Sequence, residues 1–170
     1  MDRLVLLRHG QSQWNLENRF TGWKDIGLSE KGIQEAKESG KLINAKKILI
    51  DKVYSSELKR ANETASISMR EAGYFHLFKN NELMMTKNKA VNERDYGQLT
   101  GLNKLETSEK YGKEKVHTWR RSYKVKPPGG ESLEDVVNRV RPYFEETIKR
   151  DLKGNKNILL SAHGNSLRAL

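Results

Sequence analysis

The sequence predicts an α/β fold in which helices pack around a largely parallel sheet. Short apolar runs typical of strands alternate with amphipathic stretches typical of helices, which is the pattern of strand–helix–strand units. Two apolar runs, at 4–7 and 158–160, lead directly into a strand end that carries a His-Gly pair. No linker or low-complexity segment divides the 170 residues, and this length suits one domain with a sizeable core.

The N-terminal half is predicted as strand, loop, helix, strand and helix. RLVLL (3–7) reads as a buried strand, and the polar loop at 11–26 allows a short helical turn. The helix at 28–44 has Ser29 as a plausible N-cap and places Ile33, Ala36, Gly40 and Ile43 on one face.

The middle of the chain is less regular. A short strand is predicted at 51–56, and the helix at 57–73 ends on Gly73 as a C′ residue. The stretch 75–85 is ambiguous and favours a short strand near Leu77. Residues 92–130 form a long polar connection with short helices starting near Asn103, and connections of this length in compact domains are usually functional or disordered. Its aromatic residues argue against disorder.

The C-terminal part returns to regular structure. The helix at 131–152 begins with a capping-box-like pair, Ser132 and Asp135, and Pro142 should kink it. The last strand is predicted at 157–162, and a further helix begins at 166. The predicted apolar face of the long helix consists of Val136, Val140, Phe144 and Ile148.

The composition indicates a water-soluble chain with anionic partners. The net charge is +10, the sequence pI is about 9.7, and 32% of the residues are charged. Such a balance favours phosphorylated metabolites, nucleic acid or anionic lipid, although most of the excess reads as a solvated lysine surface. With no cysteine, disulfides and cysteine-ligated metals are excluded. The sequence shows neither a spanning helix nor a signal peptide, which fits a cytosolic enzyme.

The first candidate constellation is Arg8, His9, Gly10, Ser12 and Asn15. Neutral imidazole can attack phosphorus, and an adjacent guanidinium offers forked donors to phosphoryl oxygens. The other ring nitrogen of His9 should then donate a hydrogen bond that holds the tautomer, and a backbone carbonyl would serve as acceptor. Taken alone, Arg-His-Gly is equally compatible with a histidine that only caps a strand.

The second constellation is His163, Gly164 and Asn165. Since ligands of parallel sheets bind beyond the carboxyl ends of strands, two His-Gly pairs at strand ends favour one joint site. A protonated His163 could stabilise charge on a phosphoryl group in flight. A metal site is the competing explanation, but no HExxH motif or carboxylate cluster accompanies the histidines. His76 and His117 are interpreted as structural or exposed.

Four further groups could join this site. Arg60 lies near a helix N-terminus just after the strand that ends at Ser55 and Ser56, where anions are favoured. Glu93 could exchange a proton with a substrate hydroxyl if the fold brings it close. Arg120 and Arg121 could hold a carboxylate or a second phosphate, or contact nucleic acid, and Tyr96 and Lys104 are weaker candidates.

Several longer stretches resemble one known family. These are LLRHGQSQWNLENRFTGWKD, LSEKG, YSSELKRA, NERDYGQLTGLNK, ETSEKYG, WRRSY, PPGGESL and SAHGNSLRAL. They look like the cofactor-dependent phosphoglycerate mutases of the histidine phosphatase superfamily, and the resemblance runs from Arg3 to Leu170 as a single domain. Arg-His-Gly marks only the superfamily, whereas NRFTGW, the ERDYG region and WRRSY select mutases.

The resemblance implies a three-layer α/β/α sandwich and interconversion of 3-phosphoglycerate and 2-phosphoglycerate, primed by 2,3-bisphosphoglycerate without a metal. His9 is then the phosphorylated nucleophile, Arg8, Arg60 and His163 surround the phosphoryl group, and Glu93 is the acid/base. The implied substrate-binding positions are Asn15, Thr21, Gly22, Tyr96, Lys104, Arg120, Arg121 and Asn165. The expected partners are small phosphoglycerates in the cytoplasm, with no nucleic acid and no membrane, and a homo-oligomer is possible.

Three departures from the family pattern qualify this expectation. PPGGESL lacks an insertion found in commoner members, so a smaller lid is expected. Lys24 replaces an aromatic residue, and the sequence stops at Leu170, which suggests a C-terminally truncated domain. A phosphatase that transfers the phosphoryl group to water, and a nucleic-acid-binding protein suggested by WRRSYKVK, are the alternatives.

Overall fold

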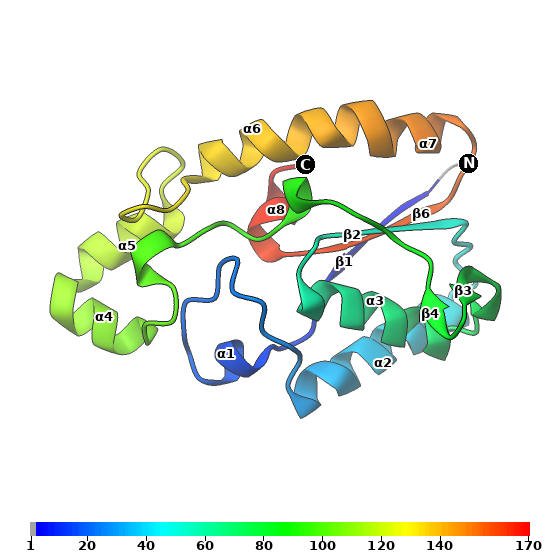
Figure 1. The fold of residues 1–170 in the computed structure, drawn as a ribbon, viewed down its shortest axis with the longest axis horizontal. Helices are drawn as coiled ribbons and strands as arrows, with labels where there is room; N and C mark the ends of the chain where they lie inside the picture. Colours follow the sequence, from blue (N-terminus) through cyan, green and yellow to red (C-terminus); the bar gives the residue numbers. More distant parts are fainter. Residues whose placement is uncertain (1–2) are drawn as a thin grey trace.

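The computed structural model describes residues 3–170 and confirms the α/β prediction (Figure 1). The main sheet contains β1 (Leu4–Arg8), β6 (Ile158–Ala162), β2 (Lys52–Ser55) and β5 (Thr86–Lys87), in that order, and every neighbouring pair is parallel. A separate antiparallel hairpin is formed by β3 (Phe78–Lys79) and β4 (Glu82–Leu83).

The helices confirm most of the predicted elements. They are α1 (Gln13–Leu16), α2 (Glu30–Ala45), α3 (Lys59–Glu71), α4 (Lys104–Tyr111), α5 (Lys113–Arg121), α6 (Leu133–Tyr143), α7 (Lys149–Lys153) and α8 (Gly164–Arg168). Short 3-10 turns occupy Phe75–Leu77, Lys89–Val91 and Gly97–Leu99, and a π-helical segment, Phe144–Ile148, joins α6 to α7.

The three layers are visible in Figure 1, with α6 and α7 on one side of the sheet and α2 and α3 on the other. Successive strand residues point to opposite faces, so each face has its own core. On the α2 and α3 face the core includes Val53, Met69 and Leu159. On the α6 face it includes Val140 and Leu160.

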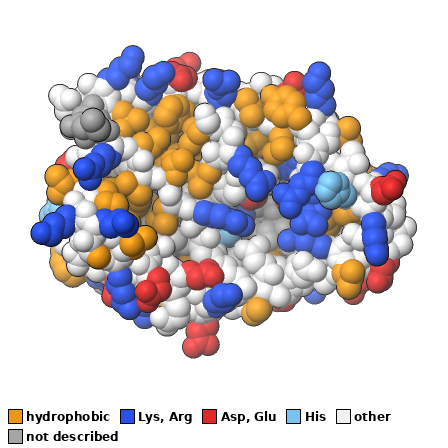
Figure 2. Space-filling model, turned by 180° about the vertical axis from the view of Figure 1, so that it is seen from behind, with side chains coloured by type: hydrophobic (Ala, Val, Ile, Leu, Met, Phe, Trp, Pro, Cys, Tyr) orange, Lys and Arg blue, Asp and Glu red, His pale blue; other side chains and the backbone are white. Residues whose placement is uncertain are grey.

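The strand β1 lies at the edge of the sheet, which corrects the prediction that 4–7 is a buried strand. Within residues 3–170 its single neighbour in the sheet is β6, and Leu6 is 47% exposed while Leu7 is buried. Hydrophobic side chains are indeed exposed in the half of the molecule near the N-terminus (Figure 2). By contrast β6, which has neighbours on both sides, is buried along its whole length.

The N-terminus of α2 forms as predicted, but its buried face differs at one position. The Ser29 hydroxyl accepts a hydrogen bond from the Gly32 amide and caps the helix. The buried positions are Gly32, Ala36, Gly40 and Ile43, whereas Ile33 is 36% exposed. Glycine at 32 lets the helix lie directly against the backbone of Gln11, so the face is shifted by one residue towards that contact.

Other predicted helix ends are also observed. Gly73 has φ +84° directly after the C-cap of α3, Asn103 caps α4, and Ser132 and Asp135 form a capping box at α6. Pro142 lies inside α6, close to its end, and the chain continues from there into the π-helical segment. The C-terminal helix begins at Gly164, two residues earlier than predicted.

Two differences remain in the fold. Leu77 belongs to a 3-10 turn, and the short strand predicted near it begins at Phe78. Phe144, which was predicted on the apolar face of the long helix, is only half-buried. The π-helical segment begins at this residue and changes the helical phase. None of the helices within residues 3–170 is long and apolar enough to cross a membrane.

We expect Gly32→Ala to destabilise the fold by about 1–3 kcal/mol, because overpacking of a close contact forces a backbone shift. An added Cβ at Gly32 would lie 2.1 Å from the Gln11 carbonyl oxygen. Gly164→Ala is the matched control, since it is also in the first turn of a helix and its Cβ would meet nothing nearer than 3.7 Å. Urea unfolding of both variants checks this, and equal stability of the two would contradict it.

Candidate active site

The parallel register of β1 and β6 brings the two predicted His-Gly pairs together. Arg8 is paired with Ala162 across β1 and β6, so the next residues, His9 and His163, leave the sheet side by side. The His9 amide donates to the Ala162 carbonyl at 3.1 Å, and the two imidazole centroids are 4.9 Å apart. Both histidines are buried, at 9% and 0% exposure.

The tautomer of His9 follows from one hydrogen bond. Nδ1 lies 2.6 Å from the carbonyl oxygen of Gly10, which can only accept, so Nδ1 carries the hydrogen. The backbone of Gly10 is itself held by Thr64, whose hydroxyl accepts from the Gly10 amide at 3.1 Å. Nε2 of His9 is therefore left with a free lone pair.

Both histidines are neutral in the unliganded site. Burial, reinforced by the Arg60 and Arg8 guanidinium groups, lowers the pKa of His9 from 6.5 to about 3, despite the opposing bond to Gly10. Burial, with Arg60 next in effect, holds the pKa of His163 well below its usual range. The expected protonated His163 is thus not favoured unless an anion enters and supplies an opposite charge.

The two ring nitrogens of His163 have different surroundings. Nε2 is 2.8 Å from the Ser56 hydroxyl oxygen, which accepts from the Leu58 amide at 3.1 Å and can donate its own hydrogen to Nε2. Nδ1 is buried and has no hydrogen-bond partner among residues 3–170. An entering phosphoryl oxygen would give this atom the partner that it lacks.

Arg60 is 1% exposed and sits at the N-terminal end of α3, as predicted. Its guanidinium donates to the carbonyl oxygens of Lys24 at 3.0 Å and Gly22 at 2.8 Å. Burial lowers the pKa of Arg60 to about 10, with Glu93 and Asp25 opposing the change, so the group stays charged at neutral pH. A buried cation paired only with neutral carbonyls is poised to accept an anion.

The histidines open into a pocket of about 230 Å³ that contains nearly all the predicted site residues. Its walls are formed by Arg8, His9, Asn15, Arg19, Thr21, Gly22, Arg60, Glu93, Tyr96, Lys104, Arg120, Arg121, Gly164, Asn165 and Arg168. Seven of these side chains are arginine or lysine, and one is a carboxylate. Such an excess of positive charge in a cleft favours a small, multiply charged anion.

A second hollow of about 520 Å³ meets the first at Arg8, His9, Asn15 and Lys104 and extends along α2 past Glu35. The smaller pocket holds Glu93 and most of the cations, and is therefore the candidate reaction site. On the face drawn in Figure 2, lysine and arginine side chains gather towards the end of the molecule where α4 and α5 lie.

The long irregular connection supplies the far wall of the pocket. Lys104 begins α4, and Arg120 and Arg121 end α5. A separate small core of Phe20, Leu99, Val116 and Trp119 holds α5 against the loop that follows α1. Burial, followed by the repulsion of Arg120, lowers the pKa of Lys104, which is a sign of crowded positive charge.

Three predicted residues lie outside the walls of this pocket. His163 lies beneath them against His9, Gly10 holds the His9 ring through its carbonyl oxygen, and Ser12 caps α1 by accepting from the Asn15 amide. His76 and His117 are exposed and do not line this pocket.

Sequence reasoning missed two pocket cations, Arg19 and Arg168, and also Ser56 as the partner of His163. Arg168 follows Asn165 by three residues on α8, so the two share a helix face, and that spacing could have indicated it. Arg19 lies in a loop whose path no periodicity reveals. Among residues 3–170 no group of three or more histidines and carboxylates could hold a metal ion.

Known proteins match this chain over nearly its whole length. Residues 4–170 match the family model described as histidine phosphatase superfamily (branch 1). The 2,3-bisphosphoglycerate-dependent phosphoglycerate mutase of Parvibaculum lavamentivorans is 53% identical over 98% of this chain and 77% of its own length. The protein of the same name from Rhodopseudomonas palustris is 51% identical over 98% of this chain and 78% of its own length.

Solved structures share the fold at lower identity. A mycobacterial glucosyl-3-phosphoglycerate phosphatase, solved in complex with VO3, is 28% identical with a TM-score of 0.81, over 100% of this chain and 78% of its own. Its complex with inorganic phosphate gives a TM-score of 0.78 over 100% of this chain and 77% of its own.

The buried neutral histidines predict a specific pH dependence of stability. A histidine in the unfolded chain binds a proton with a pKa near 6.5, whereas His9 in the folded protein has a pKa of about 3. Between these values the unfolded chain carries more protons, so the free energy of unfolding falls as the pH falls, by about 1.4 kcal/mol per pH unit for His9.

His9→Gln removes this titration, so its unfolding free energy should fall less steeply on acidification than that of the unmodified protein. Urea unfolding at several pH values between about 4.5 and 6, without phosphate in the buffer, measures both slopes. Identical slopes for the two proteins would contradict the neutral, buried state of His9.

Proposed function

The chain belongs to the histidine phosphatase superfamily, and on that premise we propose that it interconverts 3-phosphoglycerate and 2-phosphoglycerate through a phosphohistidine primed by 2,3-bisphosphoglycerate. The observation that carries this proposal is the free Nε2 of a neutral His9 inside a pocket of seven cations. The relatives near 50% identity bear the name of this reaction, which supports the same substrate class here.

In the first step the phosphoryl group passes from His9 to 3-phosphoglycerate. The substrate C2 hydroxyl oxygen attacks phosphorus, the P–Nε2 bond breaks, and its electron pair returns to the imidazole. The hydroxyl proton goes to the Glu93 carboxylate, which lines the same pocket as His9. The product of this step is bound 2,3-bisphosphoglycerate.

The second step runs in the opposite sense on the other phosphate. Nε2 attacks the phosphorus on O3, the P–O3 bond breaks, and O3 takes the proton from Glu93, which releases 2-phosphoglycerate. The Nδ1–H bond to Gly10 keeps Nε2 unprotonated throughout. Bisphosphoglycerate that leaves early must be replaced, so free 2,3-bisphosphoglycerate acts as the priming donor.

The cations supply the stabilisation that phosphoryl transfer requires, which is dispersed positive charge rather than covalent machinery. Arg8, Arg60 and His163 surround the transferring group in this proposal. Asn15 and Asn165 would add neutral donors, and the two arginines at the end of α5, which line the same pocket, would hold the substrate carboxylate or second phosphate.

The biological setting follows from the reaction. We place the chain in the cytoplasm, as an enzyme of glycolysis and gluconeogenesis whose partners are small phosphoglycerates. The chain acts as one domain, and homo-oligomer formation is possible on this account.

A phosphatase is the second candidate function, because the solved structures of similar fold include glucosyl-3-phosphoglycerate phosphatases at 28% identity. The two functions differ in what accepts the phosphoryl group from His9. A mutase must exclude water from phosphohistidine until a phosphoglycerate binds, whereas a phosphatase must admit it.

We expect 2,3-bisphosphoglycerate to add one phosphoryl group to the protein, detectable by intact mass, and His9→Ala to abolish the addition without unfolding the chain. His117→Ala is the matched control, since that histidine is exposed and outside the pocket, and it should be phosphorylated normally. A folded His9→Ala protein that still turns over substrate would rule out the proposed nucleophile.

A chase separates the two candidate functions. For a mutase, the phosphoryl group on His9 should be lost when 3-phosphoglycerate is added and retained in buffer alone. Loss at the same rate in buffer alone would establish a phosphatase instead.

We expect Glu93→Gln to reduce mutase turnover by about 10²–10⁴-fold, the usual contribution of a general acid–base group, because glutamine can neither take nor give the proton. Transfer to His9 from 4-nitrophenyl phosphate should be nearly unchanged, since nitrophenolate leaves without a proton. Stopped-flow release of nitrophenolate measures the rate of transfer from 4-nitrophenyl phosphate. If Glu93→Gln lowers this rate as much as it lowers mutase turnover, the acid–base role of Glu93 is contradicted.

A further inference from the structure

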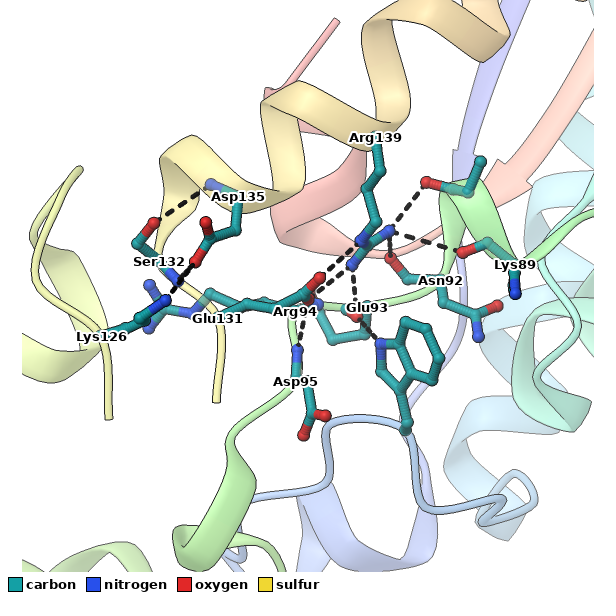
Figure 3. A network of polar contacts seen from close by, with 12 residues as sticks. Lys89, Asn92, Glu93, Arg94, Asp95, Lys126, Glu131, Ser132, Asp135 and Arg139 are labelled. Carbon is teal, nitrogen blue, oxygen red and sulfur yellow. Dashed lines mark hydrogen bonds and ion pairs between the residues drawn. The ribbon is translucent and has the colours of Figure 1, made fainter. Parts of the chain in front are cut away.

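Arg139 of α6 makes contacts that no role proposed so far uses. It is outside the pocket, and its side chain is 19% exposed. Figure 3 shows its guanidinium reaching from the helix to the segment that carries Asn92 and Glu93. Glu93 is the only carboxylate among the residues that line the pocket.

All five N–H donors of the Arg139 guanidinium have an acceptor. Nε and Nη2 form a two-pronged pair with the Glu131 carboxylate, both at 2.8 Å. Nη1 donates to the carbonyl oxygens of Ala90 at 2.7 Å and Asn92 at 3.0 Å, and Nη2 donates to that of Glu93 at 2.9 Å. The rigid fork of an arginine can serve this whole set, whereas a lysine ammonium cannot.

Glu131 extends the clamp to the other side of Glu93. Its Oε2 accepts from the Asp95 amide at 2.8 Å, and its own amide donates to the Asp95 carbonyl at 2.8 Å. The backbone is therefore held at residues 90, 92 and 93 by Arg139 and at 95 by Glu131. The backbone of Glu93 is therefore held directly and on both sides.

Trp23 joins the same clamp to the phosphoryl site. Its Nε1–H donates to the Glu93 carbonyl at 2.6 Å, and the Arg139 guanidinium lies 5.5 Å from its ring. The neighbouring Gly22 carbonyl accepts from buried Arg60. Backbone contacts thus connect the Arg60 cation with the position of Glu93.

The Glu93 carboxylate itself is held only lightly. Its Oε1 accepts from the adjacent Arg94 amide at 2.7 Å and from the Asn165 amide at 3.3 Å. A carboxylate that must move a proton between two substrate oxygens benefits from such freedom, provided that its backbone is fixed. Its placement then depends on the backbone clamp.

We propose that Arg139 is a positioning residue for proton transfer, which acts by fixing the backbone of Glu93 through the Glu131 pair. This inference rests on the proposed function, in which Glu93 gives its proton to the oxygen that leaves phosphorus. Displacement of a catalytic group by about 1 Å can lower a rate about 10²-fold. Loss of the clamp should therefore affect those transfers in which the leaving oxygen needs a proton.

The test compares donors that differ in this need. Phosphorylation of His9 is timed with 2,3-bisphosphoglycerate and phenyl phosphate, whose leaving groups need a proton, and with 4-nitrophenyl phosphate, whose leaving group does not. The variants are Arg139→Gln, Arg139→Lys and Glu131→Gln. Arg141→Gln is the matched control, because Arg141 lies on the same helix and is exposed.

We expect Arg139→Gln to slow transfer from the first two donors by about 10-fold or more, and from 4-nitrophenyl phosphate by less than about 3-fold. Arg139→Lys should remain impaired, since it keeps the charge and loses the fork. Arg141→Gln should match the unmodified protein. In a Glu93→Gln background, Arg139→Gln should add little further loss, because its effect passes through Glu93.

Three results would overturn the inference. Equal slowing with all donors would indicate a general loss of structure. Full recovery in Arg139→Lys would indicate that charge alone matters, as in the effect of Arg139 on the His163 pKa. Additive losses with Glu93→Gln would show that Arg139 does not act through Glu93.

Two arms keep the test decisive. If thermal unfolding shows that Arg139→Gln is unfolded at the assay temperature, Glu131→Gln replaces it. We expect the same donor-selective loss of transfer rate in Glu131→Gln. A loss that is equal for all donors would again overturn the inference. If the unmodified protein takes no phosphoryl group from 2,3-bisphosphoglycerate, the proposed function fails, and the two aryl phosphates alone decide the role of Arg139.

Discussion

The hydrogen bond from His9 Nδ1 to the Gly10 carbonyl is the interaction on which the rest of the site depends. It fixes which ring nitrogen is free, and it is short, at 2.6 Å. The fold holds its acceptor from two sides, through the Thr64 hydroxyl on the Gly10 amide and through direct packing of Gly10 against the Gly32 backbone. The capped start of α2, the N-terminal half of α3 and the end of β1 therefore all act on one tautomer.

The surrounding charge explains why the His9 imidazole is neutral and why the site favours an anionic ligand. Arg60 is nearly fully buried, and its hydrogen-bond partners are carbonyl oxygens. Burial and the nearby guanidinium groups lower the pKa values of both histidines. A phosphoryl dianion would relieve both conditions at once, because it partners the cations and raises the histidine pKa values. The charge that lines the pocket therefore suits a phosphoryl dianion, and Glu93 is the single carboxylate among the lining residues.

The sequence could predict what local physics decides. The Ser29 cap, the Gly73 C′ position and the Ser132–Asp135 capping box follow from short-range rules, and the two strand ends place both histidines by register. It could not show that β1 has one neighbouring strand in the described part of the chain, which leaves Leu6 exposed. Nor could it show that a glycine contact would replace Ile33 on the α2 face. Arg19, Ser56 and the Arg139 clamp depend on contacts between segments far apart in the chain, which no spacing reveals.

The most direct test of this account is to identify the phosphorylated nitrogen of His9. The protein, labelled with ¹⁵N on histidine, is treated with 2,3-bisphosphoglycerate, and phosphorus–nitrogen couplings are recorded by NMR under denaturing alkaline conditions that preserve phosphohistidine. The account predicts phosphorus on Nε2, because Nδ1 is engaged with the Gly10 carbonyl. Phosphorus on Nδ1, or on a histidine other than His9, would contradict it.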